Sequence, residues 1–298
     1  MRLLDPVALA RYDGLALRVR RGMGERPGDR RFPGRPQPSG VEIEAYSAYA
    51  PGDDLRHLDW NAVGRLDALL VRRFTAEREV LFHILLDCSA SMAVPARDNK
   101  LAVARRLAMA LAYMALATND ALRLALLAGN APPRVSPLYR QRPSAARVAE
   151  FLAGAAALGS LALGATLEDY ARRHPQPGTA FLVSDLMMAP AEVERGVQAL
   201  RARGYEVHLL HVIGRGELEP ERDFTRALLT DVESGAVHPV TLTPAARTQY
   251  QALLEAHLGA LGALADRTRT TYARLVSDGD VGAFVTIELA RRGLVGRR

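Results

Sequence analysis

The sequence predicts an α/β protein with a doubly wound, mainly parallel sheet flanked by helices and a small β unit near the N-terminus. Strand-like apolar runs alternate with helical segments over residues 80–292. The short apolar run Val80–Leu86 is typical of a strand covered on both faces. A chain of 298 residues, 49% of them hydrophobic, is long enough to bury such a core.

Two segments are expected before the main domain. Residues 1–40 are interpreted as a modest helix over Asp5–Arg20 followed by a linker, because Arg21–Gly40 is rich in Arg, Gly and Pro, which disfavour helix and sheet. Residues 41–78 are interpreted as the accessory β unit. Val41–Tyr46 alternates apolar and polar residues, and Leu69–Phe74 supplies a second strand.

Residues 79–298 are predicted to form the main domain, whose strands and helices follow one another along the chain. A hairpin around Ser234-Gly235 interrupts this alternation. The predicted strands are Val80–Leu86, Leu122–Leu127, Ala180–Ser184, Glu206–Ile213 and Tyr272–Val276. The predicted helices are Lys100–Thr118, Ser144–Ala157, Thr166–His174, Ala191–Arg203, Pro244–Asp266 and Val281–Arg292. No apolar run is long enough to predict a membrane span.

Oxygen-bearing side chains follow the first core strand at every second position. They are Asp87, Ser89 and Ser91, and a doubly wound sheet binds ligands at the carboxyl ends of its strands. One carboxylate and two hydroxyls suit a hard divalent cation, Mg²⁺ in particular. A serine-rich turn that caps the next helix is the structural alternative.

Two further residues are expected at the same edge of the sheet. Thr166 lies at a predicted loop-to-helix junction, and Asp185 follows the strand Ala180–Ser184. As alternatives, Thr166 serves as a helix N-cap and Asp185 as a turn residue. The ordered set Asp87, Ser89, Ser91, Thr166 and Asp185 resembles the metal-ion-dependent adhesion site of the von Willebrand factor A domain. That resemblance implies a Mg²⁺ site, with Mn²⁺ or Ca²⁺ as substitutes, whose open position takes a partner's Asp or Glu.

A second motif, Tyr49-Ala50-Pro51-Gly52-Asp53-Asp54-Leu55-Arg56-His57-Leu58-Asp59-Trp60, resembles the bacterial family catalogued as domain of unknown function 58. The resemblance covers about Gly40 to Arg292. Ser47-Ala48 stands where the family usually has an Arg, and Gly164-Ala165-Thr166 stands where it has Gly-Gly-Thr. From the residues themselves we expect Arg56 and Asp59 to pair and Trp60 to act as a hydrophobic anchor, with partner recognition as the alternative role.

The resemblance implies a non-enzymatic interaction module that works with a MoxR-type AAA+ ATPase in chaperone-like assembly or activation of a client protein offering Asp or Glu. Metal-dependent phosphohydrolysis is a weaker alternative, because the sequence offers no evident general base. His83, His208, His211 and His257 are expected to be structural. Ser89 lacks the surroundings of a nucleophile elbow, and Cys88 is expected to be a small buried hydrophobe.

The charge pattern permits a third alternative, nucleic-acid binding. Lys and Arg total 39 against 33 Asp and Glu, and Lys100 is the only lysine. Biased coding accounts for this arginine excess better than an anionic ligand does, because the arginines are spread along the chain apart from the dense stretch Arg20–Arg35. The single Cys88 and the absence of a secretory signal pattern make the cytoplasm the expected compartment.

Overall fold

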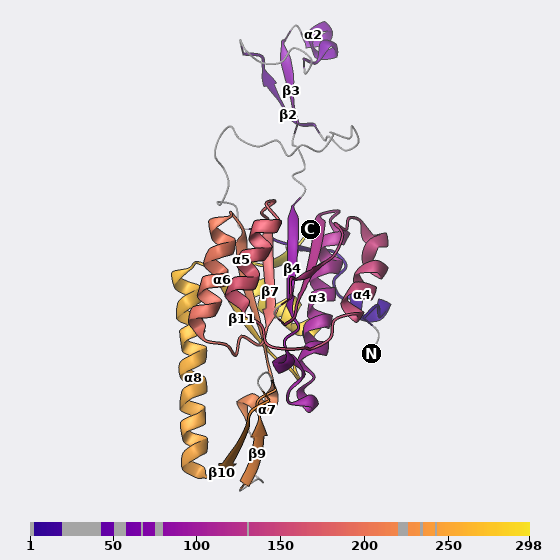
Figure 1. Cartoon of the computed structure of the whole chain (residues 1–298). Helices are drawn as coiled ribbons and strands as arrows, with labels where there is room; N and C mark the ends of the chain where they lie inside the picture. The colour runs from indigo at the N-terminus through magenta and orange to yellow at the C-terminus, as the bar shows by residue number, and fades with distance from the viewer. Residues whose placement is uncertain are drawn as a thin grey trace. The chain divides into compact units, whose positions relative to one another are not determined.

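The computed structural model describes residues 3–19, 43–50, 58–66, 68–74, 80–129, 131–219, 226–232, 235–241 and 243–298 (Figure 1). The chain divides into two compact units. The larger unit is Met1–Gly24 with Val80–Arg298, and the smaller one is Glu25–Glu79. The structure therefore groups the N-terminal residues with the main domain, whereas the sequence interpretation set residues 1–40 apart.

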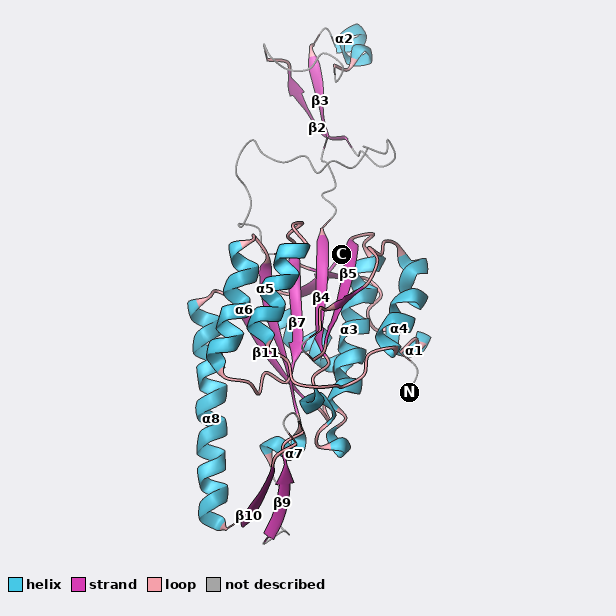
Figure 2. Ribbon diagram, in the orientation of Figure 1, coloured by secondary structure: helices cyan, strands magenta, loops and turns pink. Residues whose placement is uncertain are grey.

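A six-stranded sheet forms the centre of the larger unit (Figure 2). Its strands are β4 (Leu81–Asp87), β5 (Ala121–Leu127), β6 (Arg134–Val135), β7 (Thr179–Ser184), β8 (Glu206–Ile213) and β11 (Thr271–Val276). The spatial order is β6-β5-β4-β7-β8-β11, and every pair is parallel except β5 with β6. Counted in chain order, this is the doubly wound order 3-2-1-4-5-6, whose switch point lies between β4 and β7. The predicted fold class is confirmed.

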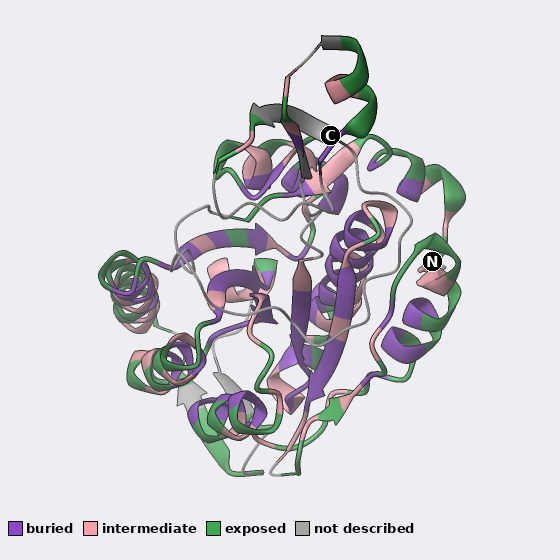
Figure 3. Ribbon diagram, turned by 90° about the horizontal axis from the view of Figure 1, so that it is seen from above, coloured by how far each residue is buried: buried purple, intermediate pink, exposed green. Residues whose placement is uncertain are grey.

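Helices cover both faces of this sheet, which is why the four central strands β5, β4, β7 and β8 are buried along almost their whole length (Figure 3). Successive side chains of β4 enter opposite cores: Phe82, Ile84 and Leu86 contact one, and Leu85 the other. The first core is covered by α3 (Lys100–Ala117) and α4 (Ala145–Ala153). The second is covered by α5 (Leu163–Arg173), α6 (Pro190–Ala202) and the inner part of α8 (Pro244–Arg267).

The N-terminal segment differs from the predicted helix. Only α1 (Pro6–Ala10) is helical, and the Asp5 side chain caps it by accepting a hydrogen bond from the backbone of Val7. The chain then forms β1 (Leu15–Leu17), which pairs antiparallel with β12 (Val295–Arg297) near the other end of the chain. A long-range strand partner thus overrides the weak helical pattern of Asp5–Arg20.

The smaller unit contains the two expected strands, β2 (Ile43–Ala48) and β3 (Leu70–Phe74), paired antiparallel. A helix that the sequence interpretation missed, α2 (Trp60–Leu66), lies between them in the chain. Asp59 is its N-cap, because its carboxylate accepts hydrogen bonds from the backbone of Asn61 and Ala62 at 3.0 and 3.3 Å. The predicted linker Arg21–Gly40 and the turn Pro51–Asp54 lie outside the described residues.

The remaining elements complete the larger unit. They are the short helix α7 (Arg215–Leu218), the hairpin strands β9 (Arg226–Thr230) and β10 (Val237–Thr241), the short helix α9 (Val281–Ala283), a π-helical turn (Phe284–Leu289), and 3-10 turns at Ala90–Ala93, Ala96–Asp98 and Arg142–Ser144. The expected hairpin and C-terminal helical segment are therefore present. Within the described ranges, no helix is both long enough and apolar enough to cross a membrane.

Candidate functional site

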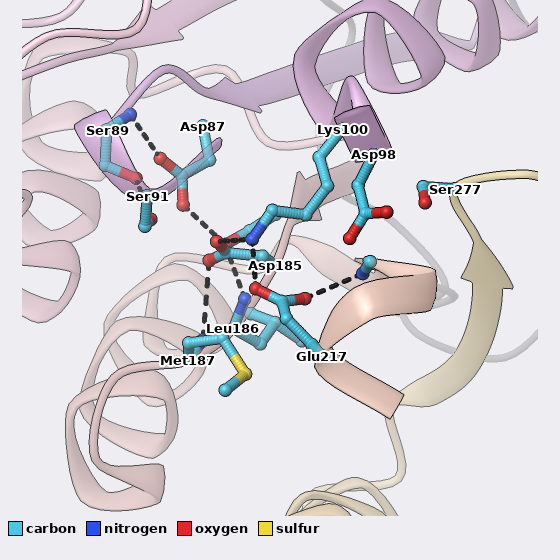
Figure 4. A network of polar contacts seen from close by, with 12 residues as sticks. Asp87, Ser89, Ser91, Asp98, Lys100, Asp185, Leu186, Met187, Glu217 and Ser277 are labelled. Carbon is cyan, nitrogen blue, oxygen red and sulfur yellow. Dashed lines mark hydrogen bonds and ion pairs between the residues drawn. The ribbon is translucent and has the colours of Figure 1, made fainter. Parts of the chain in front are cut away.

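The switch point of the sheet places Asp87 at the end of β4, on the edge where ligands bind in doubly wound folds. Its carboxylate is fully buried. Oδ1 accepts a hydrogen bond from the backbone N–H of Ser89 at 2.8 Å, which folds the chain tightly after the strand. The Oγ atoms of Ser89 and Ser91 lie 2.9 Å apart. Asp87, Ser89 and Ser91 thus form one small group of oxygen atoms (Figure 4).

Asp185 follows β7, the strand on the other side of the switch point. Ser184, the last residue of β7, donates a hydrogen bond from Oγ to Oδ2 of Asp87 and so ties the two strand ends together. The next residue, Leu186, has a left-handed backbone with φ of 48°. Such a conformation is strained for leucine, and backbone strain of this kind is concentrated at functional sites. The turn leaves the Asp185 carboxylate fully buried beside Asp87.

Three charged residues that the sequence interpretation did not assign to the site complete it. Lys100 begins α3, and its Nζ lies 2.8 Å from Oδ2 of Asp185 and forms a second ion pair with Glu217 of α7. Glu217 also accepts a 2.7 Å hydrogen bond from the backbone of Gly214. Asp98 accepts one from Gly216 at 2.9 Å. The presence of a single lysine in an arginine-rich chain was the one available sequence signal.

The site carries an excess of buried negative charge. Desolvation, then repulsion from Asp185, raises the pKa of Asp87 to about 6, although hydrogen bonds from Ser184 and Ser89 oppose the shift. Burial opposes the charged form of Lys100, but the Asp185 and Glu217 carboxylates outweigh it and raise the pKa of the ammonium. Asp87 makes no ion pair with any residue in the described ranges, so its charge is balanced only by hydrogen-bond donors.

Thr166 is the predicted site residue that the structure does not join to this group. It lies in the first turn of α5, which begins at Leu163 with Ala162 as its N-cap. Thr166 is therefore close to the predicted loop-to-helix junction but is not the N-cap. Its backbone N–H donates to Ala162 O at 2.9 Å and its side chain is half-buried, and no side-chain hydrogen bond joins it to Asp87, Ser89, Ser91 or Asp185.

The chemistry of the donor set fits a hard divalent cation. Two carboxylates and two hydroxyls meet at one edge of the sheet, and all of their donor atoms are oxygens. No cluster of three or more His, Cys, Asp or Glu suited to a metal occurs among the residues described. A metal at this position would therefore depend on hydroxyl ligands, which are what Ser89 and Ser91 supply.

The accessory motif is only partly described, because Arg56 and its expected pairing with Asp59 lie outside the described residues. Asp59 is buried and caps α2. Trp60 is 68% exposed, which corrects the expectation that it anchors the accessory unit.

Other reactive side chains have structural surroundings. Cys88 is buried in the first core, as expected. His83 and His211 are buried within strands and contact the hydroxyls of Tyr170 and Tyr272 at 2.7 and 2.8 Å. His257 contacts the backbone carbonyl of Leu186 at 2.8 Å. None of these three histidines has surroundings typical of a general base that activates water.

The fold and this cluster define a doubly wound α/β protein with carboxylates and hydroxyls gathered at its switch point. The chain belongs to the family described as Protein of unknown function DUF58, whose model matches residues 45–259. The expected family is thereby confirmed. Two relatives, "Uncharacterized protein Mb1516" of Mycobacterium bovis and "Uncharacterized protein Rv1480" of Mycobacterium tuberculosis, are each 29% identical over 216 residues, or 70% of this chain. The matches span 66% of the relatives' length, just under two thirds.

Solved structures with some likeness include the conserved hypothetical protein BatB from Bacteroides thetaiotaomicron, with a TM-score of 0.45 and 17% identity over 72% of this chain and 98% of BatB. A von Willebrand factor type A protein from Catenulispora acidiphila gives 0.41 and 20%, over 74% of this chain and 43% of that one. The von Willebrand factor domain of the pilus tip protein Mfa5 from Porphyromonas gingivalis gives 0.36 and 12%, over 74% and 97%. Because all three TM-scores are below 0.5, the description of the fold rests on this chain's own sheet topology.

Proposed function

We propose that this protein is a non-enzymatic interaction module that binds Mg²⁺ through Asp87, Ser89, Ser91 and Asp185 and captures an acidic side chain of a partner. The observation that carries the proposal is the group of buried carboxylates and neighbouring hydroxyls at the switch point. A bound divalent cation would offset the repulsion that raises the pKa of Asp87. Thr166 remains a candidate ligand on the sequence resemblance alone.

The partners are proposed from the resemblance described above. They are a MoxR-type AAA+ ATPase and a client protein that offers Asp or Glu, joined in chaperone-like assembly or activation. The net charge of +6 is suited to attracting an acidic surface toward the site. The cytoplasm is the proposed compartment, supported by the single buried cysteine, which cannot form an intramolecular disulfide.

The metal site is tested by isothermal titration of Mg²⁺ into the wild-type protein and an Asp87→Ala variant. We expect Asp87→Ala to lose at least about 90% of the binding affinity, because the variant removes the only carboxylate that extends from β4 toward the two serines. Asp169→Ala is the matched control. Asp169 pairs with Arg172 and Arg173 on the surface of α5, so Mg²⁺ binding should not change.

Partner capture is tested by pull-down of a candidate ATPase with and without EDTA. Binding that is lost with EDTA and in Asp87→Ala, but is kept in Asp169→Ala, supports the proposal. Binding that persists under all of these conditions contradicts metal-dependent capture. Steady phosphodiesterase or phosphatase turnover that Asp185→Ala abolishes would contradict the non-enzymatic assignment.

A further inference from the structure

Lys100 places a fixed positive charge inside the candidate metal site. It is the chain's only lysine, and its side chain is 1% exposed. Its ammonium lies between the end of β7 and α7, where it pairs with both Asp185 and Glu217 (Figure 4). An ammonium is a compact point charge, whereas the guanidinium of arginine is a broad planar fork, so lysine fits this enclosed position as arginine would not.

The charges of this cluster do not cancel. With all groups ionised, Asp87, Asp98, Asp185 and Glu217 contribute −4 and Lys100 contributes +1, which leaves −3. A divalent cation would offset most of this excess. The ammonium already compensates one side of the Asp185 carboxylate, so it and an incoming cation would interact with the same negative group.

The two carboxylates that contact Lys100 also have anchors of their own. Oε2 of Glu217 accepts a hydrogen bond from the Gly214 backbone at 2.7 Å, while Oε1 faces Lys100. A Cβ on Gly214 would lie 2.2 Å from Asp98 Oδ2, so this backbone is closely packed. Oδ1 of Asp185 faces the Met187 backbone N–H at 3.4 Å. Removing the ammonium therefore changes the charge of the site more than the positions of its carboxylates.

We propose that Lys100 sets the divalent-cation affinity of this site by acting as a tethered monovalent cation that shares Asp185 with the metal and repels it. The proposal rests on the metal site of the proposed function. It assigns Lys100 a role opposite to that of a ligand: its presence keeps the affinity for Mg²⁺ low, so that the site responds to changes in the cation concentration or to a partner carboxylate. Lys100 is thus a positioning and affinity-setting residue.

The test is isothermal titration of the full chain with Mg²⁺ and, separately, with Tb³⁺, at constant ionic strength. Lys100→Met keeps an unbranched side chain of similar length and removes the charge. We expect it to bind Mg²⁺ about tenfold more tightly than the wild type. The gain should be larger for Tb³⁺, because Coulomb repulsion grows with the charge of the ion. A merely structural lysine would give no such dependence on ion charge.

A further variant serves as a control. Arg291→Met removes one positive charge from an exposed pair with Glu288, outside the site, and should leave both affinities unchanged. Thermal unfolding gives a second measurement: Mg²⁺ should raise the Tm of Lys100→Met by more than it raises the Tm of the wild type.

The possible outcomes separate this inference from the function on which it rests. If the wild type binds Mg²⁺ through Asp87 while Lys100→Met, with a native circular dichroism spectrum, binds it equally or more weakly, the role of Lys100 is wrong and the metal site stands. If neither binds Mg²⁺, both proposals fail. If Lys100→Met folds only with millimolar Mg²⁺, the proposed role of Lys100 is supported. If neither Lys100→Met nor Lys100→Gln folds with Mg²⁺, the proposed role is overturned.

Discussion

Single residues of this chain show how burial determines chemical role. Asp87 and His83 belong to the same strand, and both are fully buried. Desolvation raises the pKa of the Asp87 carboxyl to about 6, whereas desolvation followed by the nearby Arg123 charge lowers the pKa of His83 to about 3. Asp87 lies at the carboxyl end of the strand, beside the switch point of the sheet. His83 lies near the opposite end, against Tyr170, and remains a neutral core residue.

His83 should make the protein sensitive to acid. Its pKa of about 3 in the folded state is below the ordinary value of 6.5, so the unfolded chain binds the extra proton first. The resulting stability is complete above about pH 6.5 and is lost as the pH falls toward 3. Between pH 7 and 5 the wild type should lose about 2 kcal/mol of unfolding free energy through this residue.

Urea denaturation of wild type and His83→Gln at both pH values measures this effect. The difference in stability between them should narrow by about 2 kcal/mol at the lower pH. His238→Gln, at an exposed position of β10, is the control and should follow the wild type. An unchanged difference between wild type and His83→Gln would show that His83 does not carry the effect.

At the scale of elements, close packing of helices decides which glycines are required. A Cβ on Gly196 of α6 would lie 2.6 Å from Leu167 Cδ1 of α5, a side chain that is itself fully buried. In α8, a Cβ on Gly262 would meet no atom within 4 Å. The same residue type is therefore a packing requirement in one helix and only a weak helix former in the other.

The same substitution should have opposite effects at these two sites. Gly196→Ala should lower the unfolding free energy by about 1 kcal/mol or more, because the added methyl group displaces Leu167 in a filled core. Gly262→Ala should raise it by about 0.5–1 kcal/mol, since it removes the entropic cost of glycine in a helix. Denaturant titration measures both. Equal signs would contradict the close approach of α5 and α6.

At the scale of the whole molecule, the two ends of the larger unit are joined by backbone hydrogen bonds. β1 pairs with β12, and the backbone N–H of Arg298 donates to Gly14 O at 3.0 Å. Leu9, Tyr12 and Leu17 are buried in the same core as α3. The N-terminal segment is thus part of the folded unit that carries the site, although the accessory unit separates them in sequence.

This arrangement predicts a stability cost at a position far in sequence from the sheet. Leu17→Ala should reduce the unfolding free energy by about 2 kcal/mol or more, because Leu17 is 7% exposed and its truncation leaves a cavity. Val19→Ala, two residues later and 38% exposed, is the matched control and should cost much less. If thermal unfolding shows equal effects, the packing of β1 against the core is not as described.

The sequence by itself determined the doubly wound fold and the order of its main elements, because apolar periodicity is a local property that each strand and helix carries within itself. It also placed Asp87, Ser89, Ser91 and Asp185 at the ends of the two strands that border the switch point. The family could be recognised from the sequence for the same reason, because its motif is a contiguous stretch of residues.

Only the tertiary structure decided how these residues are surrounded. Lys100 meets Asp185 across 85 residues and Glu217 across 117, and no local pattern encodes such a contact. The short strand β1 depends on β12 in the same way, and the exposure of Trp60 depends on what packs near it. Charge balance and burial arise from residues far apart in the chain. For this reason, the position of the Lys100 ammonium inside the candidate site is evident only in the folded molecule.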